Sequence, residues 1–580
     1  MHGGHQPADE DTYSRWVATH DRLDDGDRQR ISQRIGDLAY RPRVSILLPL
    51  ASEQVAAVEA SVRSLRRQLY PRWELIPAPW QTGRPDERYG SFPSDPRLGD
   101  AEGPPAPDRV AALNRALERA GGDYAAILGP GDLLAEHALY LLVEALHSTD
   151  PPDLVYSDED EIDVCGVRAN PVFKPDWSPD LLHSVHYIGQ LAVWRTELVR
   201  RLGGLRPEHG GAAEYDLALR ARETLQPNRI AHIPWVLYHR RRDPASAGGT
   251  SAARGRSDAE LGALRAHLEH RGPPARVREH APGVRRVSFA LPRQPPRVSV
   301  VIPTRDRVDL LRRCVAGLLG ETDYPELELL LVDNASREST TLGYLHEIGQ
   351  DPRVRVLAEP GRFNYSRMNN RAARIARGSL LAFLNNDVEI VERGWLRELV
   401  GHALRPEVGA VGALLSYASG EIQHAGIILG PGGVASLRHR GRRDPARVSY
   451  DRRPFATRNL SAVTAACMVL RRSVFDEVGG FDETDLAVAF NDVDLCLRIG
   501  RRGYRIVWTP HSRLLHHESQ SEGPHDRPER SREFQREVLV MQARWERQLR
   551  ADPFYNPNLS LELGREYELA SPPRRIRPWD

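Results

Sequence analysis

The sequence repeats itself, and this limits the chain to folds that can be built twice in succession. Three segments recur in the same order with small changes. They are 42–50 with 296–304, 113–132 with 368–387, and 215–220 with 493–498. The offset between partners grows by about two dozen residues along the chain, which predicts an insertion in the second copy within residues 388–478. Matches in one order at a slowly growing offset predict a tandem duplication.

Each copy alternates short apolar runs with amphipathic segments. In the second copy VSVVIPT, LELLLVDNAS and SLLAFLNND predict strands, VDLLRRCVAGLLG predicts a helix, and SRMNNRAARIARG predicts another with Ser366 as a candidate N-cap. This alternation predicts an α/β fold with a mostly parallel sheet and helices on both faces. Ligands bind outside the carboxyl ends of the strands in such folds. Polar residues stand there at Thr304 to Asp306, Asp333-Asn334 and Asn385 to Asp387.

The composition narrows the class of protein. Lys and Arg together number 80 against 79 Asp and Glu, so the net charge is +1 and no basic stripe is visible, which argues against nucleic acid as a partner. The four cysteines form no CxxC pair, so a reducing compartment is expected. No signal-peptide core and no run of 18 apolar residues occurs, so we expect a cytoplasmic protein without a membrane span.

These patterns predict five segments along the chain. They are a helical extension at 1–40, the first copy at 41–245, a linker with a helix and a short β segment at 246–295, the second copy at 296–525, and a C-terminal helix and tail at 526–580. Residues 84–108 are rich in Pro, Gly and Asp and predict an exposed loop, and residues 243–255 predict a flexible linker.

The second copy resembles the family 2 glycosyltransferases, which have the GT-A fold, a Rossmann-like α/β fold. The matching stretches are VSVVIPTRDR, LLLVDNAS, FNYSRMNNRAARIARGSLLAFLNNDVEI, SAVTAACMVLRRSVFDEVGGFDE, NDVDLCLRIGRRGYRIVWTP and LLHHESQS. The resemblance covers 296–525 well and 42–245 more loosely. The tandem arrangement and the YNPNLS tail are similar to O-antigen and surface-polysaccharide transferases. The resemblance implies two tandem GT-A domains and transfer of a sugar from a nucleotide-diphosphate donor to a hydroxyl of a glycan or lipid-linked acceptor, usually with inversion.

The resemblance implies a divalent cation, Mn²⁺ or Mg²⁺, bound by Asp387. The family's DxD motif falls on Asn385-Asn386-Asp387, where the first Asp is replaced by Asn. Negative charge develops on the leaving diphosphate, and a cation held by carboxylate oxygen neutralises it. A histidine that follows a later strand is a further ligand in the family. His516 is the candidate, with His517 as the alternative.

The resemblance also implies the catalytic base and the donor-binding residues. Asn491-Asp492 fits the family's ED-type motif, with Asp492 as the base that removes the proton of the acceptor hydroxyl. Asp492, Leu495 and Ile499 are spaced to share one helical face, while Asp494 is expected to be solvated or cap-like. The residues expected to bind the nucleotide sugar are Pro303, Thr304, Arg305, Asp333, Asn369, Asn385 and Asn386; Phe363 and Tyr365 are either pocket lining or core.

The first copy lacks most of these residues. The offsets place Pro79 opposite Asp333 and Pro130 opposite Asn385, while Asp132, Glu214 and His239 remain. We therefore expect a degenerate GT-A-like domain that binds or positions but does not transfer sugar.

Two further features of the first copy stand out. The acidic run at 156–163 is interpreted as a solvated loop or a metal site. Lys174, the only lysine, is either an accident of composition or a residue at a site that needs a compact ammonium.

The resemblance thus implies an inverting glycosyltransferase of bacterial surface-polysaccharide synthesis, which we expect at the inner face of the cell membrane as a peripheral protein or free in the cytoplasm. Two alternatives stay open. One is a bifunctional enzyme in which both copies transfer sugar, and the other is a non-catalytic carbohydrate-binding scaffold.

Overall fold

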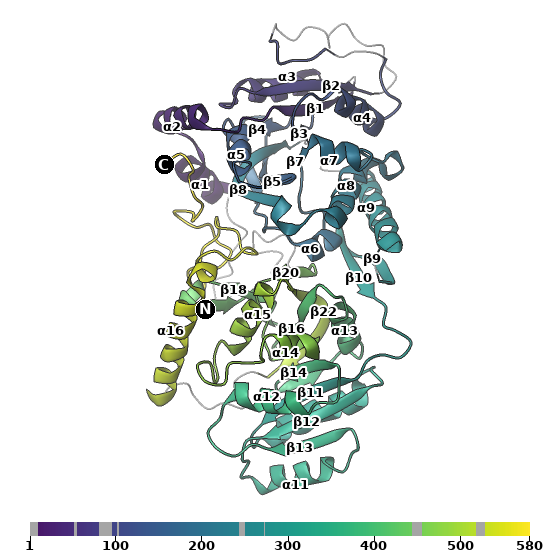
Figure 1. The fold of residues 1–580 in the computed structure, drawn as a ribbon, viewed down its shortest axis with the longest axis vertical. Helices are drawn as coiled ribbons and strands as arrows, with labels where there is room; N and C mark the ends of the chain where they lie inside the picture. Colours follow the sequence, from purple (N-terminus) through teal and green to yellow (C-terminus); the bar gives the residue numbers. More distant parts are fainter. Residues whose placement is uncertain are drawn as a thin grey trace.

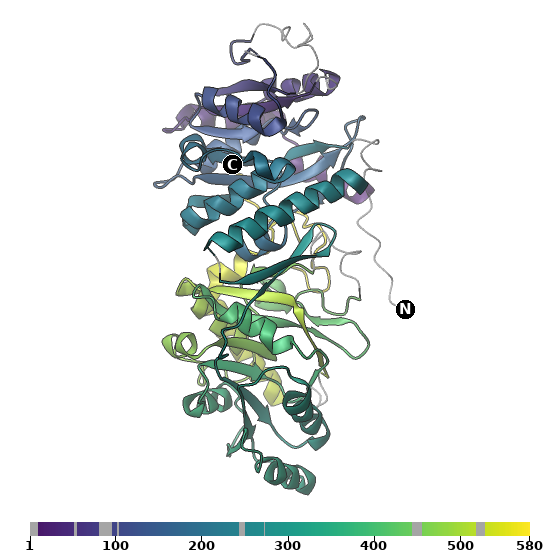
Figure 2. The same cartoon turned by 90° about the vertical axis from the view of Figure 1, so that its right-hand side faces the viewer.

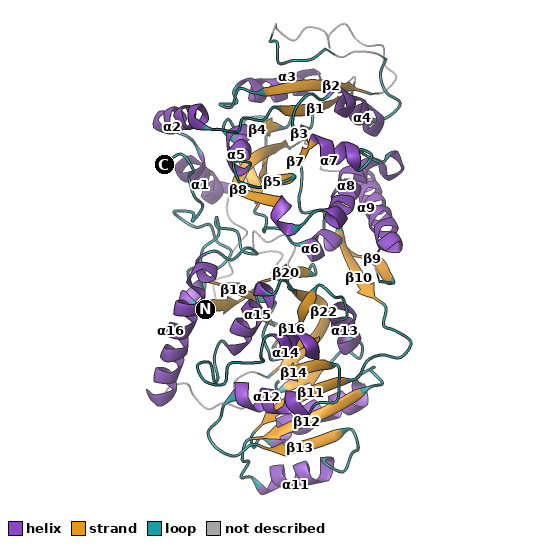
Figure 3. Cartoon of the chain, viewed as in Figure 1, coloured by secondary structure: helices purple, strands orange, loops and turns teal. Residues whose placement is uncertain are grey.

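The computed structural model describes residues 10–51, 55–80, 95–100, 104–242, 250–271, 273–443, 455–517 and 528–580. The molecule is elongated, with the first copy at one end and the second at the other (Figure 1). A quarter turn about the long axis shows the same two halves stacked end to end (Figure 2). The strands gather in two large sheets with helices around each (Figure 3).

Two helices and a π-helical turn precede the first sheet. They are α1 (Glu10–Trp16), the turn at Val17–Asp21 and α2 (Asp25–Asp37). Asp24 caps α2, because its side chain accepts the Asp27 N–H at 2.7 Å while the Asp27 side chain accepts the Asp24 N–H at 3.2 Å. These elements lie within the helical extension expected at 1–40, of which residues 1–9 are outside the described part of the chain.

The first sheet has the strand order β2-β1-β3-β7-β5-β8-β4, with β6 beside β5. Its strands are β1 (Val44–Leu50), β2 (Trp73–Pro79), β3 (Tyr124–Ile127), β4 (Leu133–Leu134), β5 (Leu154–Ile162), β6 (Arg168–Val172), β7 (Ala192–Arg195) and β8 (Ile230–Arg241). One face packs against α2, α3 (Val55–Arg66) and α5 (Ala138–Ala145). The other packs against α4 (Arg109–Arg119), α6 (Pro179–Ser184), α7 (Thr196–Arg201), α8 (Ala213–Thr224) and α9 (Thr250–Arg271).

The second sheet has the corresponding order β13-β12-β11-β14-β21-β16-β22-β15, with β17 beside β16 and β20 beside β22. Its strands are β11 (Val298–Thr304), β12 (Leu327–Asp333), β13 (Val354–Ala358), β14 (Leu380–Leu384), β15 (Val388–Ile390), β16 (Val408–Ser416), β17 (Ile422–His424), β20 (Arg458–Leu460), β21 (Cys467–Arg471) and β22 (Arg505–His516). Helices α10 (Val308–Ala316), α11 (Ser339–Ile348) and α13 (Trp395–Ala403) cover one face. Helices α12 (Tyr365–Ile375), α14 (Arg472–Glu477), α15 (Asn491–Arg501) and α16 (Pro528–Arg550) cover the other.

The fold class is the predicted one, α/β with helices on both faces of each sheet. The strands β11, β12, β13 and β14 are parallel, and β21 then enters antiparallel to β14. The extra residues of the second copy lie between β16 and β21, which falls within the predicted range. There β17, β20 and the small sheet of β18 (Ile427–Leu429) and β19 (Ala435–Leu437) stand where the first copy has β6 and α6.

The connection between the copies differs from the prediction. Residues 243–249 lie outside the described part of the chain, but Thr250 already begins α9, so the predicted linker at 243–255 is wrong over its last six residues. A hairpin of β9 (Ala275–Ala281) and β10 (Val284–Phe289) then leads into β11. The predicted loop at 84–108 lies largely outside the described residues.

The two copies share individual hydrogen bonds as well as strand order. Asn114 of α4 donates to Leu205 O at 2.8 Å and accepts the Leu205 N–H at 2.9 Å. Asn370 of α12 makes the same pair of bonds to Phe481, at 2.8 and 2.9 Å. A Cβ on Gly480 would come within 2.5 Å of the Asn370 Oδ1, and the φ of +73° there favours glycine.

A second group of matching hydrogen bonds involves one aspartate in α8 and one in α15. Arg220 donates to Asp216 at 2.8 Å and Arg498 donates to Asp494 at 2.7 Å, in both cases one helical turn away. Asp494 is fully buried and also accepts from Arg544 and Trp545 of α16, both at 2.9 Å. The expectation of a solvated Asp494 is therefore wrong, because α16 covers it.

The junction between the halves contains buried polar contacts. Arg405 donates to Asp180 at 2.6 Å, and Asn459 donates to the other oxygen of Asp180 at 2.7 Å. The tail after α16 continues over the first half, where Asn556 and Asn558 donate to Asp158 at 2.8 and 3.2 Å. These contacts fix the second half against the first.

The acidic run at 156–163 is strand β5 and the start of the following turn, not a solvated loop. Asp158 and Asp160 are buried, and Asp160 accepts from Tyr13 at 2.8 Å and Arg168 at 2.5 Å. Lys174 is fully buried, and its ammonium donates to Glu159 at 3.0 Å and Ile188 O at 2.6 Å. Asp158, Glu159 and Asp160 are thus partnered by protein groups of the first half and of the C-terminal tail, so they hold these segments together.

Candidate active site

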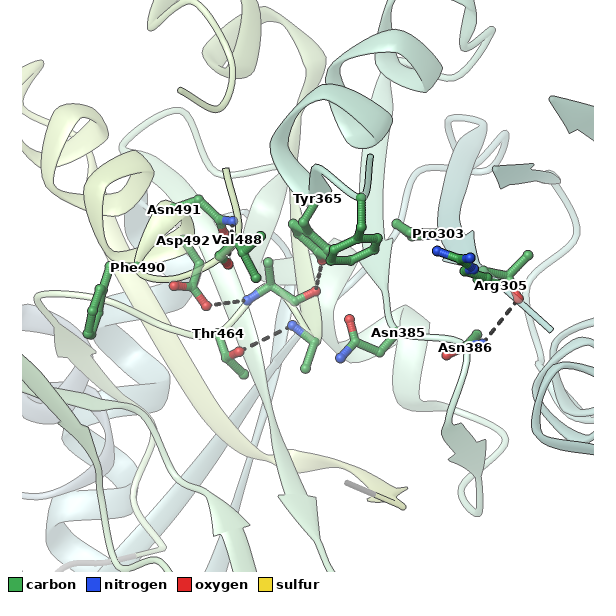
Figure 4. Close-up of a pocket in the computed structure, with 14 residues that line it drawn as sticks. Pro303, Arg305, Tyr365, Asn385, Asn386, Thr464, Val488, Phe490, Asn491 and Asp492 are labelled. Carbon is green, nitrogen blue, oxygen red and sulfur yellow. Dashed lines mark hydrogen bonds between the residues drawn. The ribbon is translucent and has the colours of Figure 1, made fainter. Parts of the chain in front are cut away.

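A pocket of about 330 Å³ opens at the carboxyl ends of β11 and β14 (Figure 4). It is lined from four directions by strand ends, the start of α12, the residues before β21, and the start of α15. The lining residues are Pro303, Thr304, Arg305, Phe363, Tyr365, Asn385, Asn386, Thr464, Ala465, Ala466, Val488, Phe490, Asn491 and Asp492. Six of the sequence-predicted site residues therefore share one cavity.

The expected donor side consists of the ends of β11, β12 and β14. Thr304 and Asp333 are paired across the parallel strands β11 and β12, which places both at the same edge of the sheet. Asn386 donates to the Thr304 hydroxyl at 3.1 Å, and the Asp333 carboxylate accepts the Ser336 N–H at 3.1 Å. Asp333 is a neighbour of the pocket and does not line it.

Asp387 and His516 lie together beside Asn385, and neither of them lines the pocket. Val388 of β15 pairs with His516 of β22, which puts the imidazole beside the preceding residue. His516 Nε2 is 3.1 Å from Asp387 Oδ1 and 3.4 Å from Asn385 Nδ2. His517 instead meets Glu389 at 2.8 Å, because successive strand residues point to opposite faces. Of the two histidines, His516 is the one next to Asp387.

The pair offers a divalent cation one carboxylate oxygen and one imidazole nitrogen. His516 is buried and its Nδ1 has no hydrogen-bond partner in the part of the chain that the structure describes. No cluster of three or more His, Cys, Asp and Glu side chains that could hold a metal occurs among the described residues. The two groups fit a cation whose other ligands come from water and a diphosphate, since Mg²⁺ and similar ions are bound by few protein oxygens in phosphate-binding sites.

Asp492 stands in the first turn of α15, on the opposite side of the pocket from Arg305 (Figure 4). Its carboxylate accepts the Ala465 N–H at 3.0 Å and the Val493 N–H at 2.8 Å. Burial raises the pKa of Asp492 above its usual value, although these backbone hydrogen bonds act in the opposite direction. Leu495 and Ile499 are fully buried, so the predicted apolar face holds the helix start in place.

Several pocket residues were not assigned a role from the sequence. Of the two alternatives for Phe363 and Tyr365, the structure shows pocket lining, and the Tyr365 hydroxyl donates to Ala465 O at 3.1 Å. Thr464, Ala465 and Ala466 lie in the stretch SAVTAAC, whose match to the family was the available signal. Asn369, which the sequence predicted to bind the donor, does not line the pocket; it is buried, and its amide donates to Tyr365 O at 2.8 Å.

The start of α12 also corrects a prediction. The N-cap is Asn364, whose side chain accepts the Arg367 N–H at 2.8 Å, and not Ser366. Ser366 lies inside the helix and donates to Leu486 O at 2.5 Å, which ties α12 to the loop before α15.

The first copy holds different groups at the equivalent places. Strand pairing aligns β3 with β14 at an offset of 256 but β4 with β15 at 255, so Gly129-Pro130-Gly131-Asp132 is one residue longer than Asn385-Asn386-Asp387. Asn385 therefore corresponds to Gly129, and not to Pro130 as the sequence offset predicted. Asp132 accepts from the Tyr238 hydroxyl and from the Arg241 N–H at 2.8 Å.

The other two remaining groups of the first copy are also engaged. His239 lies 2.6 Å from Asp160, and Glu214 accepts from Arg109 at 2.6 Å. Burial would raise the pKa of Glu214, but the Arg109 guanidinium lowers it below its usual value. The pKa of Glu214 is thus lowered whereas that of Asp492 is raised, because Glu214 has a cation beside it and the hydrogen-bond donors of Asp492 are uncharged.

The mostly parallel sheet of the second half, with helices on both faces and a pocket at the carboxyl ends of its strands, has the GT-A fold of glycosyltransferases. The sequence model of "Glycosyl transferase family 2" matches residues 299–479. The chain belongs to this family.

Three relatives show how far the similarity extends. An uncharacterized protein of Sinorhizobium fredii is 40% identical over 559 residues, 94% of this chain and 61% of that protein. The O-antigen biosynthesis protein RfbC of Myxococcus xanthus is 37% identical over 536 residues, 91% of this chain and 41% of that protein. The N-acetylglucosaminyl-diphospho-decaprenol L-rhamnosyltransferase of Mycobacterium tuberculosis is 30% identical over 234 residues, 37% of this chain and 73% of that protein. The chain thus spans about three fifths and two fifths of the length of the first two relatives.

Proposed function

We propose that this chain is an inverting, metal-dependent glycosyltransferase that moves a sugar from a nucleotide-diphosphate donor to a hydroxyl of a glycan or lipid-linked acceptor. The observation that supports this best is the arrangement of the pocket. Asp492 lines it together with Asn385 and Asn386, and the Asp387–His516 pair adjoins these two asparagines. A donor between them would have its leaving diphosphate beside the pair and its anomeric carbon facing the base.

In this proposal Asp492 takes the proton of the acceptor hydroxyl as the new glycosidic bond forms. The bond between the anomeric carbon and the phosphate oxygen breaks on the opposite side, and the electron pair leaves with the nucleoside diphosphate. Attack opposite the leaving group inverts the anomeric centre and requires no covalent intermediate. The raised pKa of Asp492 makes its carboxylate a stronger base, which favours removal of the proton from the acceptor hydroxyl.

The donor would be held by residues of β11, β12 and β14. Pro303, Thr304 and Arg305 would line the nucleotide, and Asp333 would hydrogen-bond the base or ribose from the pocket edge. A Mn²⁺ or Mg²⁺ ion bound by Asp387 and His516 would supply Lewis-acid neutralisation of the leaving diphosphate.

The two halves are proposed to be tandem GT-A domains at 41–245 and 296–525, of which only the second transfers sugar. The matched bonds of Asn114 and Asn370 support a duplication. The engagement of Asp132 and Glu214 by Tyr238 and Arg109 supports loss of catalysis in the first copy. A bifunctional enzyme would need these groups to be released, and a non-catalytic scaffold would not need the Asp492 pocket.

The setting is proposed to be surface-polysaccharide synthesis in the cytoplasm, at the inner face of the membrane. The Myxococcus relative is an O-antigen biosynthesis protein, which supports an O-antigen-like product. The Mycobacterium relative is named for a sugar linked to diphospho-decaprenol, which supports a lipid-linked acceptor. Within the described residues, every helix is too short or too polar to cross a bilayer.

The test is a donor-hydrolysis screen of the purified chain with UDP-, GDP- and dTDP-sugars, each with Mn²⁺ or Mg²⁺. We expect one donor class to be hydrolysed and the Asp387→Ala variant to lose that activity. Hydrolysis that is absent from the wild type with every donor, or that persists undiminished in Asp387→Ala, would contradict the proposal.

A further inference from the structure

A groove of about 660 Å³ adjoins the active-site pocket, and Phe363 lines both. The loop at 483–488 separates them, since Ala487 lines the groove and the next residue, Val488, lines the pocket. The groove is therefore on the Asp492 side, where an acceptor would approach. Its remaining walls come from the start of α12 and the first turns of α16.

Helix α16 is fixed against this loop by a buried carboxylate. Glu537 is 1% exposed, and its two oxygens accept the Val488 and Ala489 N–H groups at 2.9 and 2.8 Å. Arg532 and Arg536 lie five residues and one residue before Glu537, respectively, and line the groove from the same helix. Because the helix is anchored at Glu537, these two guanidinium groups have a defined position beside the pocket.

The charges that line the groove are four arginines and two glutamates. The arginines are Arg362, Arg367, Arg532 and Arg536, and the glutamates are Glu483 and Glu533. Both glutamates have cationic partners, since Arg362 donates to Glu533 at 2.7 Å and Arg374 donates to Glu483 at 3.0 Å. The net charge of the lining is positive.

Two of the arginines keep donors available to a ligand. Arg536 donates to the carbonyl oxygen of Thr484 at 2.9 Å, which is a neutral partner. Arg532 is exposed and forms no ion pair with any side chain that the structure describes. Guanidinium groups bind phosphate through paired N–H donors, so Arg532 and Arg536 give the groove the donors that a phosphate requires.

Phe534 adds an apolar surface next to these donors. Its ring is 50% exposed, and its centroid is 5.4 Å from that of Phe490, which lines the pocket. A ligand that carries a phosphate together with a hydrocarbon chain would find partners for both parts along α16.

We propose that this groove binds a phosphate or diphosphate ester carried by the acceptor, with Arg532 and Arg536 as its ligands. The inference rests on the proposed transfer function and names the class of acceptor. The phosphate would anchor the acceptor outside the pocket while its sugar hydroxyl reaches Asp492.

The test uses farnesyl diphosphate as the probe and measures its binding to the full chain by calorimetry at low salt. We expect Arg532→Gln/Arg536→Gln to raise the Kd about tenfold or more, which corresponds to a loss of about 1.4 kcal/mol or more, since the variant loses charge-assisted hydrogen bonds to the phosphate. Arg532→Gln alone, at an exposed position, should raise it by a smaller factor without affecting folding. Arg547→Gln removes the same charge from an exposed site further along α16 and should leave the Kd unchanged.

Two comparisons locate the probe and its chemistry. Farnesol and inorganic pyrophosphate should each bind more weakly than farnesyl diphosphate; equal binding of farnesol would show an apolar site and overturn the proposal. Binding should survive in Asp387→Ala, which disturbs only the donor side. If the probe is instead lost in Asp387→Ala and kept in the arginine variants, it occupies the donor pocket and the groove is not its site. Donor hydrolysis, measured separately, reports on the transfer function itself.

Discussion

The imidazole of His516 lies 3.1 Å from the carboxylate of Asp387, although 128 residues separate them in the chain. The pairing of β15 with β22 brings them together. Asp387 directly precedes β15 and His516 ends β22, so a cation bound by this carboxylate and this imidazole would depend on the pairing of both strands.

Removing either group should abolish metal-dependent turnover. We expect Asp387→Ala and His516→Ala each to reduce transfer by about 10²-fold or more, since Lewis-acid stabilisation contributes several kcal/mol. The matched control is His517→Ala, because His517 contacts Glu389 on the other face of the strand. The measurement is turnover against Mn²⁺ concentration; a deeper loss in His517→Ala than in His516→Ala would reverse the assignment of the ligand.

Asp492→Asn should lower turnover by about 10²–10⁴-fold, because the amide keeps the size of the side chain but cannot take a proton. Donor affinity should change little, since the donor contacts lie across the pocket. Single-turnover kinetics and donor titration separate the two quantities. If donor affinity collapsed while turnover at saturation survived, Asp492 would be a binding residue.

The activity should fall on the acidic side at a higher pH than an ordinary aspartate would cause. Burial raises the pKa of Asp492, and the base works only when it is deprotonated, so the rate is lost as the pH falls through that raised value. The pKa of an unperturbed aspartate is about 3.9. The measurement is kcat against pH for the wild type, and the residual activity of Asp492→Asn should lack this acidic limb.

Glu214→Gln in the first half should leave the rate of sugar transfer within about twofold of the wild type, since partly exposed ion pairs such as that of Glu214 with Arg109 contribute about 1 kcal/mol or less. The bond to Arg109 already engages this carboxylate, so its loss should not affect the reaction in the second half. Circular dichroism verifies that the variant is folded. A loss as deep as that of Asp492→Asn in a folded protein would show that the first copy is catalytic.

The buried pair of Asp180 and Arg405 should be important for stability at the junction. Arg405→Ala leaves the carboxylate buried without its cation, and removing one partner of such a pair costs about 3–5 kcal/mol. Urea unfolding measures the loss. Arg297→Ala is the exposed control, since its pair with Glu326 at 3.1 Å should contribute about 1 kcal/mol or less. Equal effects of the two variants would contradict a special role for the junction pair.

The sequence predicted the strands well because each is an apolar run that stops at a polar residue, as with VSVVIPT and the end at Thr304. It also placed most of the pocket, since strand ends of a parallel sheet meet at one edge. It failed at Asp494, because spacing along one helix carries no information on α16, which supplies Arg544 and Trp545 from 50 residues further on. It failed for the run at 156–163 for the same reason, since Tyr13 and Asn556 reach these carboxylates from both distant ends of the chain.

The pocket lining at Thr464 to Ala466 shows a different limit. These residues contribute mainly backbone groups, such as the Ala465 N–H that Asp492 accepts. Every residue other than proline has a backbone N–H, so the residue type does not reveal which of these groups is a donor in the site. Glu537 was missed for a related reason, because a lone glutamate in a charged helix gives no sign that it is buried against two amide groups.

The matched bonds of Asn114 and Asn370 give every molecule its own internal control. Asn114→Ala and Asn370→Ala remove corresponding bonds to Leu205 and Phe481, so the costs of these bonds to folding can be compared within one protein. Asn370→Ala also removes a bond to Glu483 at 2.8 Å, so any excess effect of this variant measures what that bond and the nearby pocket contribute.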